Sequence, residues 1–156
     1  MAKTDPLLKL AAELDKESDR ALAILAASYL DHLLGCLITT TLGLEGIPKA
    51  AHKFLFEGPN AGLADFSARI EMVGHLEIFS KAEIKDLHRI RKIRNEFAHD
   101  FTGVSFDAQK VADLCGALKI TKDDRGPLTP RECYKRATLQ FMITILCQIR
   151  SHGEDD

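Results

Sequence analysis

The sequence predicts an all-α protein, a single-domain multi-helix bundle around one central apolar helix. The polar–apolar alternation of half-buried strands is nearly absent, while helix-capping and helix-stop residues recur along the chain. The chain has 156 residues, of which 46% are hydrophobic. This is enough to form one sizeable hydrophobic core, but too little for two separate cores. We therefore expect one domain over residues 1–156, with frayed ends at about 1–5 and 152–156.

Three helices are expected in the N-terminal half. Pro6 opens a short one, because a proline at the first helical position loses no hydrogen bond. Ser18 and Asp19 can cap a long apolar helix that ends near Gly43. A brief helix around Phe54 lies between two turn clusters, GLEGIP and EGPNAG.

The C-terminal half has clearer start signals. Ser80 with Glu83, and Thr129 with Glu132, form capping boxes, in which a hydroxyl and a carboxylate satisfy free N–H groups of the first turn. Pro130 stands at the first helical position after the second box. Together with the apolar periodicity, these signals predict helices at about 65–77, 80–98, 107–118 and 130–151.

The run from Ala21 to Leu44 is long and apolar, yet Asp31 and His32 lie near its midpoint. An acid at the centre of a bilayer costs roughly 2.5–3.5 kcal/mol, which favours a buried core helix over a membrane span. A buried carboxylate without a counter-charge is costly, so Asp31 predicts an arginine nearby.

Charge and cysteine spacing exclude several functions. With 21 basic and 23 acidic side chains the net charge is −2, which gives no overall attraction to nucleic acid and disfavours direct DNA binding. The cysteines are widely spaced and read as reduced thiols of a cytoplasmic protein; they are Cys36, Cys115, Cys133 and Cys147. His52, His75 and His88 stand on separate segments, so we expect no metal and no cofactor.

The segment RKIRNEFAHD, residues 91–100, places an arginine among apolar side chains. At about 100° per residue, Arg94 falls inside the apolar arc that includes Ile90, Ile93 and Phe97. It should therefore pair with an interior acid such as Asp31 or Glu71, or face a second subunit.

His99 projects roughly 140° further round the helix and about 7.5 Å along it, so the two side chains do not touch within one regular helix. A structural ion pair and a functional role for Arg94 both remain open. In the segment FSARIE, Arg69 and Glu71 favour a structural role, with Arg69 clamping an adjacent loop.

Two stretches carry a family resemblance. Residues 58–107, which include FSARIE and IRKIRNEFAH, and residues 19–34, DRALAILAASYLDHLL, resemble the mannitol operon repressor family of small bacterial proteins. The resemblance covers most of the chain and implies a non-enzymatic, all-helical repressor of transcription without a familiar DNA-binding module. It implies action through a protein partner, a regulator or a transport component. We also expect a homodimer, with the apolar arc around Arg94 as its interface.

The motif Arg94-Asn95-x-x-x-His99 also resembles the arginine–histidine signature of the HEPN superfamily. Active members of that superfamily are helical bundles that cleave RNA without a metal. The alternative function is therefore a metal-independent endoribonuclease, or an RNA-binding relative. In this alternative His99 moves a proton, Arg94 stabilises the charge that develops on the phosphate, and Asn95 positions the reacting group.

Overall fold

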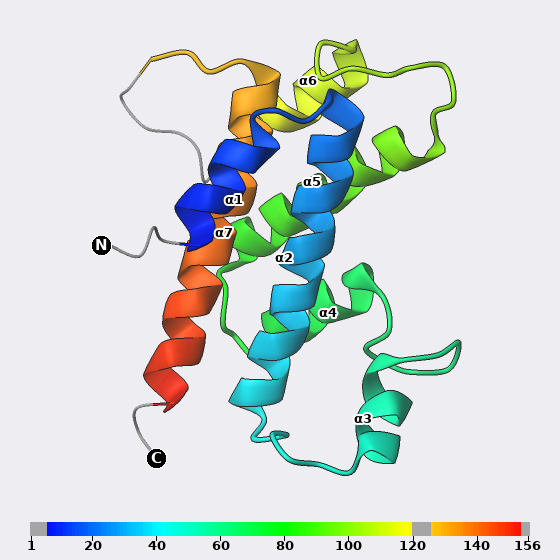
Figure 1. Ribbon diagram of the computed structural model, residues 1–156, viewed down its shortest axis with the longest axis vertical. Coiled ribbons are helices and arrows are strands. Elements are labelled where there is room, and N and C mark those ends of the chain that lie inside the picture. The colour runs from blue at the N-terminus through cyan, green and yellow to red at the C-terminus, as the bar shows by residue number, and fades with distance from the viewer. Residues whose placement is uncertain (1–5, 120–125, 154–156) are drawn as a thin grey trace.

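The computed structural model describes residues 6–119 and 126–153, which form seven helices and no strand (Figure 1). The prediction of an all-α bundle is confirmed. Most of the expected frayed ends, residues 1–5 and 154–156, lie outside the described residues. The helices are α1 Pro6–Leu14, α2 Asp19–Thr41, α3 Lys49–Phe56, α4 Phe66–His75, α5 Lys81–His99, α6 Gln109–Gly116 and α7 Pro130–Gly153.

Local capping explains where several helices begin. The Ser18 hydroxyl accepts a hydrogen bond from the third residue of α2. At the start of α5, the Ser80 hydroxyl accepts from the Glu83 N–H, and the Glu83 carboxylate accepts from the Ser80 N–H at 2.8 Å. Thr129 and Glu132 make the same reciprocal pair at the start of α7. Both predicted capping boxes are therefore present.

Helix α2 is the centre of the bundle. It packs most extensively against α7, and α5 and α4 cover its other sides. By length and hydropathy α2 could also cross a membrane, but the helices around it bury its leucine-rich faces, as in the core helix of a globular domain. One strip stays uncovered, where Leu25 is 51% and Tyr29 39% exposed.

The first turn of α2 is tied to two distant segments through one carboxylate. Asp19 accepts a hydrogen bond from the guanidinium of Arg131 on α7 at 2.6 Å and from the backbone N–H of Phe106 at 3.0 Å. Arg131 also donates to the carbonyl oxygens of Leu14 and Glu17, between α1 and α2. These bonds fix α7 lengthwise against α2.

A ring cluster fills the core between α5 and α7. Phe106 lies between Phe97, with ring centroids 4.8 Å apart, and Tyr134, with centroids 5.3 Å apart. The Tyr134 hydroxyl donates to the carbonyl of Ala23 at 2.7 Å, and burial raises the pKa of this hydroxyl. Burial also raises the pKa of the Cys115 thiol to about 12, so this cysteine is neutral.

Tyr134→Phe removes a buried hydrogen bond between α7 and α2 without emptying the ring's space. We expect it to lower the free energy of unfolding by about 1 kcal/mol. Chemical denaturation measures the change. The control is Tyr29→Phe at the exposed tyrosine of α2, which should change stability by less than about 0.5 kcal/mol. Equal effects of the two variants would contradict the assignment of Tyr134 as the buried link.

Candidate functional site

Asp31 and Arg69 form an ion pair between α2 and α4. Nη1 of Arg69 lies 3.0 Å from the Asp31 carboxylate and also donates to the Asp31 carbonyl at 3.2 Å. Nε of Arg69 donates to the carbonyl of Leu63, in the segment before α4, at 2.9 Å. Arg69 therefore clamps a loop, and it supplies the counter-charge that Asp31 needs.

The ion pair lies in a half-buried position. The Arg69 guanidinium rests against α2 at Gly35, where a β-carbon would come 3.6 Å from its central carbon, and lies 6.0 Å from the centroid of the Phe56 ring. Burial raises the pKa of Asp31 despite the opposing charge of Arg69 and the weaker opposing charge of Arg94. Arg69 therefore offsets part of the cost of burying this carboxylate.

Glu71, also on α4, serves a different contact. Its carboxylate lies 2.7 Å from Nε2 of His88 on α5. Glu71 therefore pairs with His88 and not with Arg69, with which it shares a helix. The carboxylate is more than half exposed, so this contact adds little stability.

Arg94 takes an amide as its partner. Its Nη1 donates to Oδ1 of the neighbouring Asn95 at 3.0 Å, and the side chain is half-buried. The expected direct ion pair with Asp31 or Glu71 is not formed: Asp31 pairs with Arg69 and Glu71 with His88. Arg94 acts on Asp31 only as a weaker nearby charge that lowers its pKa. The expected dimer interface on the apolar arc is also wrong. Ile90, Ile93 and Phe97 are fully buried within the chain, where α5 packs against its neighbours.

Asn95 and His99 line one shallow hollow at the C-terminal end of α5, about 500 Å³ in volume. Glu96, Asp100, Phe101 and Thr102 complete its lining. Arg94 does not line this hollow and reaches it only through its bond to Asn95. Two of the three residues of the predicted catalytic motif thus line the hollow, and the third is bonded to one of them.

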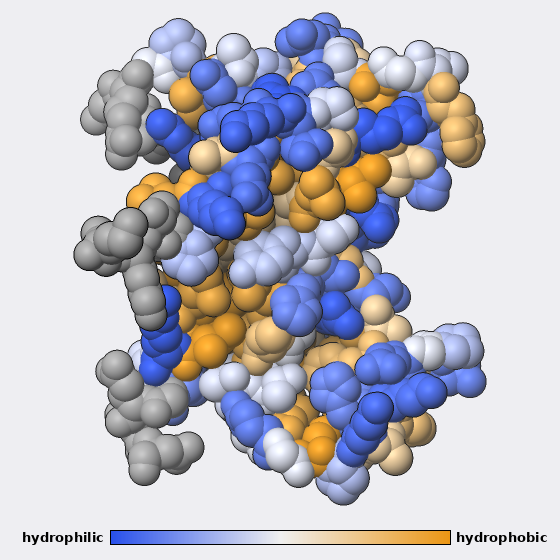
Figure 2. Space-filling view, viewed as in Figure 1, coloured by the Kyte–Doolittle hydropathy of each residue, from blue (hydrophilic) through white to orange (hydrophobic). Residues whose placement is uncertain are grey.

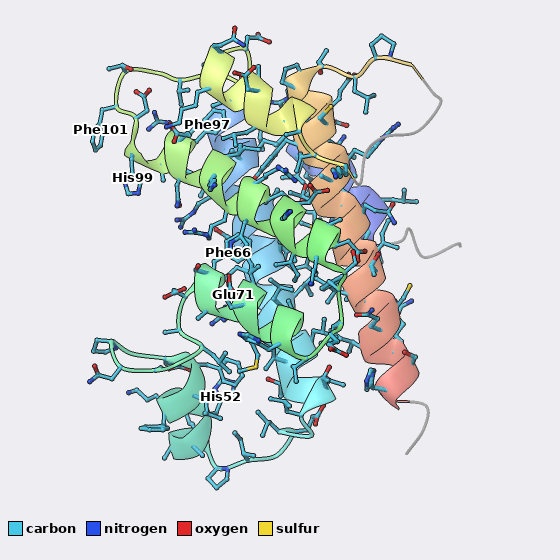
Figure 3. The ribbon with its side chains drawn as sticks, turned by 180° about the vertical axis from the view of Figure 1, so that it is seen from behind. His52, Phe66, Glu71, Phe97, His99 and Phe101 are labelled. Atoms are coloured by element: carbon cyan, nitrogen blue, oxygen red, sulfur yellow. The ribbon has the colours of Figure 1, made fainter. Side chains whose placement is uncertain are left out.

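Phe101 projects from this end of α5 into solvent, as Figure 3 shows together with His99. Its side chain is 92% exposed. The backbone on either side is held, since Arg20 donates to the carbonyl of Asp100 and the Asp100 carboxylate accepts from the N–H of Thr102 at 2.6 Å. The hydrogen bonds from Thr102 lower the pKa of Asp100. Sequence reasoning missed Phe101, although an aromatic residue between a helix end and a Thr-Gly turn was a usable signal.

The outer face of α5 is basic. A second shallow hollow there is lined only by basic side chains, which are Lys85, His88, Arg89 and Lys92. Part of this charge is balanced locally, because Arg89 lies 2.7 Å from Asp86. The basic face and the hollow beside Phe101 follow one another along the same helix.

Comparison with known proteins supports the fold. No family model matches the sequence, and no curated protein matches it at a significant level. Among solved structures, the chain is similar to a chain in the X-ray structure of the MtlR-HPr complex from Escherichia coli, with a TM-score of 0.60 and 17% sequence identity. The match covers 94% of this chain and 97% of that one. The two chains therefore share an all-helical fold over nearly their full lengths.

Arg69→Met leaves Asp31 half-buried without its counter-charge. We expect the free energy of unfolding at neutral pH to fall by roughly 1–3 kcal/mol. The loss should shrink in acid. The pKa of Asp31 in the folded protein is already above the ordinary 3.8, and it rises further when Arg69 is removed. The variant therefore keeps its stability at low pH, where the carboxyl is protonated. It loses stability as the pH rises through the raised pKa.

The test is chemical denaturation of the unmodified protein and of the Arg69→Met variant over a series of pH values, which gives the free energy of unfolding of each. Lys110→Met provides the control, since its ion pair with Glu96 is exposed and should contribute less than about 1 kcal/mol. A cost for Arg69→Met that stays constant or grows in acid would show that the ion pair is not the cause.

Proposed function

We propose that this protein is a non-enzymatic, cytoplasmic regulator of the mannitol-repressor type, which represses transcription by binding another protein. The observation that carries the proposal is the fold shared, over nearly the whole length, with a chain of the MtlR-HPr complex. The family resemblance of residues 19–34 and 58–107 points the same way. The partner to test first is the HPr protein of the organism that carries this chain.

The charge distribution supports a protein partner over DNA. The net charge of −2 gives no general attraction to a phosphate backbone. Part of the charge of the basic face of α5 is balanced, because Arg89 pairs with the buried Asp86. Further along the helix, Glu96 pairs with Lys110 of α6. Such a surface suits a partner with its own acidic and apolar groups, because charge steers the encounter and apolar burial holds the complex.

Phe101 is the proposed apolar contact. Burying a phenylalanine side chain contributes about 1.5–3 kcal/mol. The Phe101 ring is almost fully exposed in the free chain, so nearly all of this free energy is available when a partner covers the ring. Its flanking bonds hold the backbone in place, so little conformational entropy is lost on docking. Asn95 and His99 beside it supply polar groups for the rim of the contact.

The expected homodimer remains a proposal, now with a different surface. Leu25 and Tyr29 on α2, and Ile143 on α7, are apolar side chains that stay exposed in the described chain. Figure 2 shows hydrophobic side chains reaching the surface along α2 and α7. A second copy covering this surface would complete the burial of α2.

Phe101→Ala should weaken binding to HPr about tenfold or more, because roughly 1.5–3 kcal/mol of apolar burial is lost and 1.4 kcal/mol corresponds to a factor of ten. The melting temperature should not fall, since the ring makes almost no intramolecular contact. Calorimetric titration measures the affinity. Phe54→Ala on α3 is the matched control, because that phenylalanine is also highly exposed but lies elsewhere. Failure of the unmodified protein to bind HPr would reject this partner.

One observation favours cleavage or binding of RNA as a second function. Asn95 and His99 line the same hollow, and Arg94 donates to Asn95, so the motif forms a connected polar group at an exposed helix end. Two copies of the motif facing each other would bring the arginine and histidine of both protomers to one phosphate. The exposed ring of Phe101 could stack on a base in either role.

His99→Ala should abolish RNA cleavage while the fold is retained, because no other histidine lines the hollow. The assay uses varied single-stranded RNAs in the presence of a chelator, since the proposed chemistry needs no metal. His75→Ala, at the exposed C-terminal end of α4, should keep full activity. If the unmodified protein cleaves none of these RNAs, the ribonuclease function is rejected and the regulatory function is the one that remains.

A further inference from the structure

A hollow of about 560 Å³ lies between the C-terminal half of α2 and the outlying helix α3. Four side chains that commonly bind metal ions line it: His32 and Cys36 come from α2, and His52 and Glu57 come from α3 and the residue after it. Arg69 also lines the hollow, and its charge is balanced by the ion pair with Asp31. This hollow is separate from the one at the end of α5, since the two share no lining residue.

His32 and Cys36 are one helical turn apart and already spaced for one ion. Nε2 of His32 lies 3.6 Å from Sγ of Cys36. A tetrahedral zinc ion with a Zn–S bond of about 2.3 Å and a Zn–N bond of about 2.0–2.1 Å holds its two ligand atoms about 3.5 Å apart. The separation of the two atoms therefore matches the spacing of two ligands on one Zn²⁺ ion.

His52 and Glu57 form a second pair on the opposite wall. Nδ1 of His52 lies 3.8 Å from the Glu57 carboxylate, and its ring stacks on Phe56 with centroids 4.8 Å apart. Figure 3 shows the His52 side chain on the part of α3 that faces the bundle. The wall thus offers a second imidazole and a carboxylate to the same space.

Helix α3 is the helix with the fewest contacts to the rest of the bundle. It packs only lightly against the other helices, and Figure 1 shows it set apart from the bundle at the end of two long connections. Gly43, Gly46 and Gly58 in these connections have φ of +60°, +77° and +97°, values that glycine adopts without strain. Small changes at these turns would bring α3 closer to α2.

Among the described residues, no three His, Cys, Asp or Glu side chains lie close enough together to hold an ion as they stand. We propose that the two pairs are the halves of one zinc site: Zn²⁺ bound by His32 and Cys36 draws His52 and Glu57 onto the same ion and fastens α3 to α2. The Cys36 thiol releases its proton to solvent as the Zn–S bond forms. A thiolate and a carboxylate then balance the two charges of the ion.

The donor set selects the ion. Thiolate and imidazole ligands favour zinc over magnesium or calcium, which prefer oxygen. Burial raises the pKa of the free Cys36 thiol, with Arg69 opposing this effect. The metal-free thiol is therefore protonated at neutral pH and becomes a strong ligand only as the ion displaces its proton.

The test titrates the full chain with Zn²⁺ in competition with a chelating dye, and with Co²⁺ to detect sulfur-to-metal absorption. We expect one ion per chain and a melting temperature that rises with zinc concentration. Removing a residue that only hydrogen-bonds to a metal ligand lowers metal affinity roughly 10- to 100-fold. Cys36→Ser and His32→Ala remove ligands themselves, so each should lower zinc affinity more than tenfold. Cys36→Ser should also abolish the sulfur band.

His52→Ala tests the closure of α3. It should lower zinc affinity about tenfold or more while leaving the sulfur band in place. Cys147→Ser, at the exposed cysteine of α7, should bind zinc as the unmodified protein does, and circular dichroism checks that each variant is folded. The proposal is overturned if the unmodified chain fails to bind zinc at micromolar concentration, if Cys147→Ser abolishes binding, or if His52→Ala binds as tightly as the unmodified chain.

Discussion

Helix α2 is apolar on nearly every side, so other helices must cover it for the chain to fold in water. Each fully buried leucine or isoleucine contributes about 1.5–3 kcal/mol, and α2 supplies a dense series of them between Leu22 and Ile38. Helices α7, α5 and α4 provide the cover. The strip they leave open, at Leu25 and Tyr29, is therefore the part of α2 with most to gain from a further contact.

Two carboxylates on this apolar helix need partners, and the partners they take fix the neighbouring helices. Asp19 binds Arg131 and so sets the position of α7, while Asp31 binds Arg69 and so sets the position of α4. Hydrophobic packing alone tolerates sliding along a helix, whereas a partly buried ion pair accepts few positions. We infer that these two contacts contribute more to the register of the bundle than to its stability.

The same packing decides what the surface can do. Helix α5 turns Ile90, Ile93 and Phe97 inward, so its basic face and the tip with His99 and Phe101 point outward. The tip offers an apolar ring on a fixed backbone beside polar groups, which suits a protein contact. The hollow under α3 is a different kind of site, with ligands suited to a metal ion on two walls.

Sequence by itself determined the helices, their caps and the central place of α2, because capping and apolar periodicity depend on residues within a few positions of each other. It also showed that Asp31 needed an arginine and that His99 and Arg94 could not meet on one regular helix. Only the tertiary structure chose Arg69 over Arg94, buried the arc once expected to face a second subunit, exposed Phe101 and set His52 across from Cys36. These outcomes depend on which helices pack together and at what angle, and that is decided by the whole core at once.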